Sequence, residues 1–320
     1  MRNTESKKQN KGSFVGLLDE PTQAKASGLA FTLAAIAPVL LTVLFVIVVG
    51  ALGLMKEGVE QKDWYLYSSV LLPQIAFVIV AMLYFKWTKS SFKMAIKEQK
   101  CKPKYFLLAI ILQFGLMSLS ELNTLFLKLL GNIGYQDVGI SLPSMNGVGF
   151  IGVLIAVAIL PAILEEVIFR GLLLKGLHGF GTALSVVICG GLFALYHQNP
   201  AQTLYQFCCG MAFALVAIKS GSILPTVLSH FLNNAAILVL TKLGIISFSP
   251  TVQFALIIGC SLCLIGSLIY LIFIDKQGAC TSRNEKIDKK EVKNFWLYAA
   301  VGIVVCAISW LTMLLTGIVG

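Results

Sequence analysis

Residues 161–175 read Pro-Ala-Ile-Leu-Glu-Glu-Val-Ile-Phe-Arg-Gly-Leu-Leu-Leu-Lys, and they place three charged side chains inside an otherwise apolar run. On a helix, Glu166 and Arg170 are four residues apart, so they share one face and can pair. Glu165 is turned about 100° away from that pair. A carboxylate at the centre of a bilayer costs roughly 2.5–3.5 kcal/mol on insertion scales, so we expect Glu165 to face the protein interior or a water-filled cavity. Glu165 is therefore the first candidate for a functional role.

The composition around this stretch predicts a membrane protein. The chain has 320 residues, of which 57% are hydrophobic and 12% charged, and its mean hydropathy is +0.85. Soluble domains carry about 25% charged residues, so we expect an all-α, polytopic helical membrane protein. Runs long enough to cross a hydrocarbon core of about 30 Å occur at approximately 28–54, 65–85, 105–130, 147–175, 182–198, 201–219, 222–243, 250–274 and 295–319. This pattern predicts about nine transmembrane helices, with eight possible because the fifth and sixth runs are the shortest.

The basic residues indicate how the chain is oriented. The net charge is +10, but the lysines and arginines lie in the tails and loops between the apolar runs, so we expect lipid phosphate as their neighbour and no nucleic acid. Twenty-one of the 25 basic residues fall in segments on one side, chiefly the N-terminal tail, the segment 86–104 and the segment 275–294. Cytoplasmic loops carry such an excess, so the N-terminus is predicted to be cytoplasmic.

Further polar side chains interrupt the later apolar runs. His197 ends the fifth run, and His230 and Asn234 share one helical face in the seventh. Counted from the cytoplasmic turns at a rise of ~1.5 Å per residue, Glu165, His197, His230 and Asn234 lie roughly 15, 24, 12 and 18 Å into the membrane. These depths overlap, and short connections join the helices, so we expect the four side chains to converge.

Two chemistries suit such a cluster. A buried glutamate beside a histidine can hold and deprotonate a water molecule, and an asparagine amide with a second imidazole can stabilise the oxyanion formed by attack on a peptide carbonyl. Alternatively, histidine nitrogens and a glutamate oxygen can hold a divalent metal such as zinc, with one position open for water. The H-E-x-x-H pattern is absent, and the residues leave both mechanisms open.

Three segments carry a resemblance to a known family. The segment Glu165-Glu166-Val-Ile-Phe-Arg170 resembles the E-E-x-x-x-R motif of the CPBP family, the intramembrane proteases that include type 2 CAAX prenyl endopeptidases and bacteriocin-processing (Abi) proteins. Phe193-Ala-Leu-Tyr-His197 resembles the family's F-x-x-x-H motif, and His230-Phe-Leu-Asn-Asn234 resembles its H-x-x-x-N motif. All three occur in the family's order within about 144–243.

The resemblance implies roles for these residues. Glu165 would be the general base that activates water together with His197, Glu166 and Arg170 would brace the site, and His230 and Asn234 would stabilise the oxyanion. The substrate would be a peptide or membrane-anchored protein. Eukaryotic members trim three residues from prenylated CAAX proteins, whereas bacterial relatives are associated with peptide maturation, bacteriocin self-immunity or regulation, so the choice between a CAAX-type and a bacteriocin-like or signal-peptide-like substrate stays open. We expect a bacterial plasma membrane as the location.

The resulting division of the chain has four parts. We expect a cytoplasmic tail over 1–27, three transmembrane helices over 28–143 with the Lys-rich loop 86–104, the catalytic helical core over 144–243, and two C-terminal transmembrane helices over 244–320. An alternative function is a non-catalytic membrane immunity or scaffold protein that keeps the motifs as a polar network. A transporter would predict inverted repeats and broken helices in corresponding halves, and neither is visible in the sequence.

Overall fold

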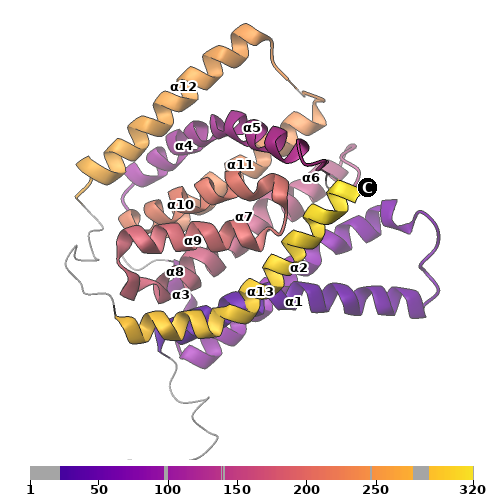
Figure 1. Ribbon diagram of the computed structural model, residues 1–320, viewed down its shortest axis with the longest axis horizontal. Coiled ribbons are helices and arrows are strands. Elements are labelled where there is room, and N and C mark those ends of the chain that lie inside the picture. Colours follow the sequence, from indigo (N-terminus) through magenta and orange to yellow (C-terminus); the bar gives the residue numbers. More distant parts are fainter. Residues whose placement is uncertain are drawn as a thin grey trace, which may run out of the picture.

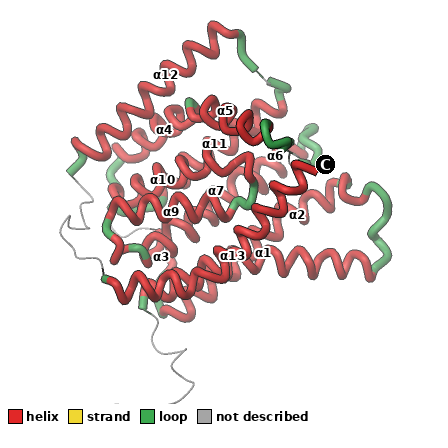
Figure 2. The backbone as a smooth tube through the Cα atoms, viewed as in Figure 1, coloured by secondary structure: helices red, strands yellow, loops and turns green. Residues whose placement is uncertain are grey.

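The computed structural model describes residues 22–96, 100–137, 139, 141–245, 247–276 and 288–319. Helices joined by turns and loops make up this part of the chain, and it contains no β-strand (Figure 2). The all-α prediction is therefore confirmed. Most of the expected tail 1–27 lies outside the described residues, as does much of the basic segment 275–294.

The helical elements follow one another in a simple order. They are α1 (Gln23–Ala51), η2 (Val59–Gln61), α2 (Asp63–Thr88), α3 (Phe92–Ile96), α4 (Lys104–Met117), α5 (Leu119–Gly131), α6 (Gly149–Val153), η3 (Leu154–Ile159), α7 (Leu160–Glu166), η4 (Val167–Leu173), α8 (Leu174–Gly176), η5 (His178–Phe180), α9 (Thr182–Tyr196), η6 (Pro200–Gln202), α10 (Thr203–Ser220), α11 (Leu224–Lys242), α12 (Pro250–Ile269), η7 (Tyr270–Ile274) and α13 (Lys289–Val319). The stretch from α6 to α8 is one continuous helical span.

Eight helical segments of the described chain are long and apolar enough to cross a membrane. This supports an integral, multi-pass membrane protein. The fifth predicted run forms α9, which has only 15 residues and a length of roughly 22 Å, less than the hydrocarbon core of about 30 Å. Helix α10 packs along α9, and the turn at 197–202 joins them.

The helix ends gather on two opposite sides. On one side Gly179 accepts a backbone hydrogen bond from Asp288, and Ile96 accepts one from Ile223. On the other side Gly317 accepts a hydrogen bond from the backbone N–H of Gln136, and the Lys242 ammonium donates to Met145. These hydrogen bonds thus join segments that are far apart in the sequence at the helix ends.

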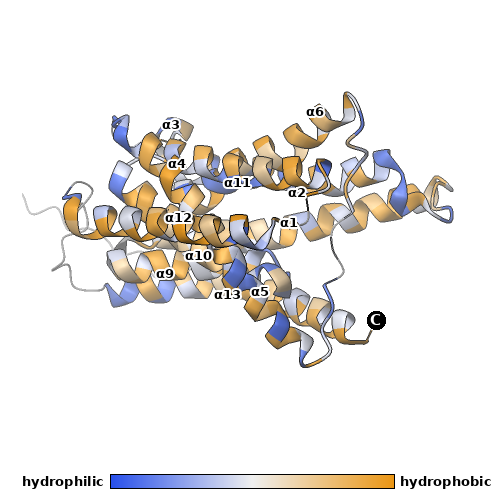
Figure 3. Ribbon diagram, turned by 90° about the horizontal axis from the view of Figure 1, so that it is seen from above, coloured by the Kyte–Doolittle hydropathy of each residue, from blue (hydrophilic) through white to orange (hydrophobic). Residues whose placement is uncertain are grey.

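The three motifs lie on the innermost helices. In Figure 1, α7, α9, α10 and α11 occupy the middle, with α4, α5 and α12 on one side and α1, α2 and α13 on the other. Half of the most apolar window of the span 149–176 is buried, against 11% for 250–274. Hydrophobic residues run along most of the length of the helices, and hydrophilic residues gather toward helix ends and loops (Figure 3). Many large hydrophobic side chains on the outer helices are exposed, whereas Glu165, Glu166, Arg170 and His230 are buried. Lipid-facing helices therefore surround a polar centre.

Glycines allow the closest helix contacts. A Cβ on Gly302 of α13 would lie 2.6 Å from the Thr32 Cα of α1. Thr32 also donates a hydrogen bond to the Tyr298 carbonyl (2.6 Å) and accepts one from the Gly302 amide (3.1 Å). Small residues with polar links of this kind are typical of helix pairs in membranes. They fix α13 against α1.

Candidate active site

The E-E motif lies where the helix departs from regular α geometry. Glu165 and Glu166 end α7, between the π-helical segments η3 and η4. Pro161 has no N–H, so the carbonyl of Val157 lacks the donor that a regular α-helix would supply from four residues onward. Single π-turns inside α-helices are frequent at functional sites. The sequence therefore produces both an irregular helix and an available carbonyl beside the acidic pair.

Glu166 is the electrostatic centre of the cluster. Its Oε1 accepts a hydrogen bond from Arg170 Nη1 at 2.7 Å and a second from His230 Nδ1 at 3.0 Å. The side chains of Glu166 and Arg170 are fully buried. Arg170 also donates from Nη2 to the Gly210 carbonyl at 3.1 Å, and this hydrogen bond links α10 to η4. The buried pair thereby fixes the orientation of the His230 ring.

Phe193 packs the charged and aromatic side chains together. Its ring centroid lies 4.4 Å from the Arg170 guanidinium carbon, 4.7 Å from the His197 ring and 6.0 Å from the His230 ring. The first distance is that of a cation–π interaction. The aromatic residue of the F-x-x-x-H pattern thus packs against Arg170 and both histidines.

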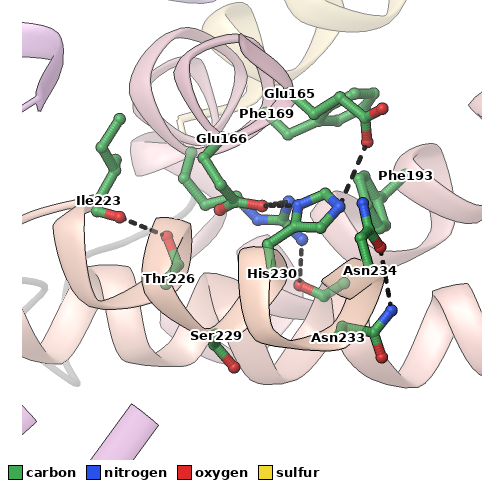
Figure 4. Close-up of polar contacts among 12 residues, drawn as sticks. Glu165, Glu166, Phe169, Phe193, Ile223, Thr226, Ser229, His230, Asn233 and Asn234 are labelled. Atoms are coloured by element: carbon green, nitrogen blue, oxygen red, sulfur yellow. Dashed lines mark hydrogen bonds and ion pairs between the residues drawn. The ribbon is translucent and has the colours of Figure 1, made fainter. Parts of the chain in front are cut away.

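Glu165 carries an unused carboxylate oxygen. The residue is 9% exposed, and its Oε2 lies 3.9 Å from His230 Nε2 (Figure 4). Among the described residues this oxygen has no hydrogen-bond partner. A buried carboxylate oxygen without a partner is costly, so it is available for a water molecule or a substrate.

His197 approaches the cluster from the end of α9. Its Nδ1 lies 2.8 Å from the Phe193 carbonyl, which can only accept, so Nδ1 carries the proton and Nε2 is the basic nitrogen. Phe169 and Phe193 are in contact, with centroids 5.0 Å apart. Glu165 lies about one turn before Phe169 and His197 about one turn after Phe193 on antiparallel helices, so both extend toward the same end. In the described structure they share no hydrogen bond, and the imidazole nearest to Glu165 is that of His230.

Asn234 lies one turn beyond His230 on α11. Its Nδ2 donates to the Val157 carbonyl at 3.2 Å, the carbonyl that Pro161 leaves without an α-helical donor. Its Oδ1 accepts a hydrogen bond from Asn233 Nδ2 at 3.2 Å. In Figure 4 the amide nitrogen lies on the side of Glu165 and the His230 ring. All six predicted site residues thus lie on the central helices. His197 contacts the others only indirectly among the described residues, because its ring packs on Phe193, which in turn contacts Arg170 and His230.

Residues 147–236 match the family model of Type II CAAX prenyl endopeptidase Rce1-like proteins. This segment belongs to that family. The match contains all six candidate residues, so the resemblance seen in the three motifs is confirmed, and the family is one of proteases. No curated protein and no solved structure matches the chain significantly. The identification therefore rests on the Rce1-like segment together with the geometry above.

A polar network outside the predicted site residues supports the Rce1-like segment. Gln113 of α4 donates from Nε2 to Asn233 Oδ1 at 2.9 Å and accepts from the Ser229 hydroxyl at 2.9 Å. The Tyr205 hydroxyl donates to the same Asn233 oxygen at 2.7 Å. Sequence reasoning did not single out Gln113. The available signal was a lone glutamine within the apolar run 105–130.

An open groove reaches the Rce1-like segment at His197. It has a volume of about 430 Å³ and is lined by His197, Gln198, Ile308, Ser309, Thr312, Met313 and Thr316. Gln198 has a positive φ of 52°, which is uncommon for a residue with a side chain. The other wall is the second half of α13, which lies outside the Rce1-like segment. The groove gives a path from outside the bundle to one candidate catalytic side chain.

The described side chains do not form a metal-binding set. Across the described ranges, no group of three or more His, Cys, Asp or Glu side chains is arranged to hold a metal ion. His230 Nδ1 lies against Glu166 and His197 Nδ1 against the Phe193 carbonyl, so Nε2 is the nitrogen of each ring that could serve as a ligand. The donor set therefore does not fit a zinc site with three protein ligands, and we derive no step through a metal.

Proposed function

We propose that this protein is an intramembrane endopeptidase that hydrolyses a peptide bond in a membrane-associated peptide or protein, with water activated by Glu165 and His197. The observation that carries the proposal is the oxygen of the buried Glu165 carboxylate that has no hydrogen-bond partner among the described residues and lies 3.9 Å from Nε2 of His230, the imidazole that Glu166 and Arg170 hold. Membership of residues 147–236 in a protease family supports it.

The first step forms the new carbon–oxygen bond. Glu165 takes a proton from a water molecule, and the water oxygen adds to the carbonyl carbon of the scissile peptide. The basic Nε2 of His197 shares the proton. The electron pair of the C=O bond moves to the carbonyl oxygen, which becomes an oxyanion. No external base is needed, because Glu165 supplies it.

The second step breaks the carbon–nitrogen bond. The oxyanion accepts hydrogen bonds from Asn234 Nδ2 and from His230 Nε2, whose imidazolium form is balanced by the Glu166 carboxylate at 3.0 Å. When the oxyanion collapses, the peptide nitrogen leaves and receives the proton from Glu165 or His197. The products are a carboxylic acid and an amine, and the site returns to its starting protonation.

The setting of the reaction belongs to the same proposal. We place the N-terminus in the cytoplasm, the catalytic core at 144–243, and the flanking helices of 28–143 and 244–320 around it as elements that select substrate. A bacterial plasma membrane suits the basic cytoplasmic segments. The family description favours a prenylated C-a-a-X peptide over a bacteriocin-like one as the first substrate class to test.

Peptide cleavage by the detergent-purified protein tests the proposal. The probes are two quenched fluorescent peptides of one sequence, one ending in a farnesylated Cys-a-a-X and one not prenylated, each with and without a chelator. We expect cleavage of the prenylated peptide that the chelator leaves unchanged. Loss of cleavage with the chelator would contradict the metal-free mechanism. Cleavage of neither peptide nor of a wider peptide library by folded protein would favour an immunity or scaffold role.

A further inference from the structure

The Val157 carbonyl fixes the direction of a chain of side-chain amides. A carbonyl oxygen can only accept, so the end of Asn234 that lies 3.2 Å from it must be the NH₂ group. The Asn234 oxygen then faces Asn233, which must present its own NH₂ group at 3.2 Å. This backbone acceptor therefore identifies which end of each of the two amides is the NH₂ group.

Gln113 completes this chain from a different helix. With the NH₂ group of Asn233 turned to Asn234, its oxygen faces Gln113 Nε2 at 2.9 Å and the Tyr205 hydroxyl at 2.7 Å. The Gln113 oxygen in turn accepts from Ser229 at 2.9 Å. Gln113 and Asn233 are buried, at 4% and 8% exposure. If the Asn233 amide were reversed, its NH₂ group would face the NH₂ group of Gln113 and its oxygen would face that of Asn234, in a region where water cannot compensate.

We propose that Gln113, which lies outside the Rce1-like segment, is a positioning residue that acts through Asn233 to keep the NH₂ group of Asn234 turned toward the reacting carbonyl. This inference rests on the proposed function, in which Asn234 donates to the oxyanion. Among the described residues, Asn234 Nδ2 makes one hydrogen bond, to Val157, so its second N–H is left for the oxyanion. If the amide turned over, its oxygen would meet the oxyanion and repel it.

The arrangement also explains why a glutamine lies in the third apolar run. A residue at this position must donate to Asn233 and accept from Ser229 at once, and a glutamine amide does both without charge. Leucine would do neither, and an ionised glutamate would only accept. An ionised glutamate would draw the NH₂ group of Asn233 toward itself and reverse the chain.

A double-mutant cycle tests the positioning role. We would measure kcat and KM on the prenylated peptide for wild type, Gln113→Leu, Asn234→Ala and the double variant. Removing one oxyanion donor costs roughly 10²–10³ in kcat, and loss of its orientation should cost about 10- to 100-fold. We expect that drop for Gln113→Leu with KM changed by less than about 2-fold, and no further drop in the Asn234→Ala background.

Two further variants keep the test decisive. Asn233→Asp retains oxygens for Gln113 and Tyr205 but removes the N–H that the Asn234 oxygen accepts, so it should reproduce the loss if Gln113→Leu fails to fold. Gln253→Leu is the matched control, because Gln253 is bonded to Glu121 and not to the network. It should keep wild-type kcat.

The outcomes distinguish a failure of the positioning role of Gln113 from a failure of the proposed protease function. Wild-type kcat in Gln113→Leu or Asn233→Asp, or an equal loss with and without Asn234, would overturn the positioning role while leaving the protease proposal intact. A folded wild-type protein that cleaves no peptide would instead overturn the proposed function.

Discussion

At the scale of single residues, the site is organised by one carboxylate oxygen. Glu166 Oε1 receives both Arg170 and His230, and the three side chains lie among the rings of Phe193 and Phe213. A buried ion pair adds little net stability over apolar residues, but loss of one partner leaves a buried charge. The Glu166–Arg170 pair therefore holds His230 in place, but loss of either partner would destabilise the fold.

Removal of the Arg170 charge should show how strongly stability depends on the pairing of Glu166. We expect Arg170→Met to lower the free energy of unfolding by roughly 3–5 kcal/mol, because the Glu166 charge would stay buried without its partner. Thermal unfolding in detergent and protein level in membranes measure the loss. The double variant Glu166→Gln/Arg170→Met should recover much of the stability but not the cleavage activity. An unchanged midpoint in Arg170→Met would contradict the bracing role.

At the scale of elements, the hairpin of α9 and α10 sets the position of His197. The two helices meet at Gly190 and Gly210, where a Cβ on Gly210 would lie 2.7 Å from the Gly190 Cα. The Gly210 carbonyl also accepts from Arg170 at 3.1 Å. A side chain added at Gly210 must push α10 away from both α9 and η4.

Gly210→Val should therefore reduce both stability and activity. Overpacking typically costs about 1–3 kcal/mol, and the shift of the Arg170 acceptor should lower kcat as well. Gly266→Val on α12 is the matched control, since a Cβ there meets nothing within 4 Å. Circular dichroism melts and peptide cleavage would be compared. Equal behaviour of the two variants would show that the hairpin contact is not critical.

Much of the helical structure was predictable from the sequence, and the features that were not predictable have physical reasons. Apolar runs and four-residue spacing predicted the helices and the Glu166 and Arg170 pair, because membrane helices must satisfy their backbone internally. The run 182–198 also predicted the short α9, which ends at Tyr196. Spacing within single helices did not reveal that His230 lies nearer to Glu165 than His197 does, or that Gln113 reaches Asn233, because it carries no information about contacts between helices.

At the scale of the whole molecule, helices outside the Rce1-like segment complete the site. Helix α13 forms one wall of the groove at His197, and α4 supplies Gln113. We expect Thr312→Trp to fill the groove and raise KM for the peptide by about 10-fold or more, by blocking access. Leu311→Trp is its control, because Leu311 is 51% exposed and absent from the groove wall. Equal KM values for the two variants would argue against substrate entry along α13.

The orientation of the whole molecule is also testable. With the N-terminus in the cytoplasm, the loop after α1 faces outward and the loop after α2 faces inward. A reporter that is active only outside the cytoplasm should therefore be active when inserted at Gly58 and inactive when inserted at Ser90. The reverse pattern would show that the basic segments face outward, contrary to the charge distribution.

Cleavage of the prenylated peptide by wild type and by Glu165→Gln tests the central claim most directly. Glutamine keeps the size of the side chain but cannot take a proton from water, so we predict a loss of about 10²–10⁴ in kcat with an unchanged unfolding midpoint. Glu121→Gln, a carboxylate bonded to Gln253 away from the site, should keep wild-type activity. Full activity in well-folded Glu165→Gln would contradict the assignment of Glu165 as the base.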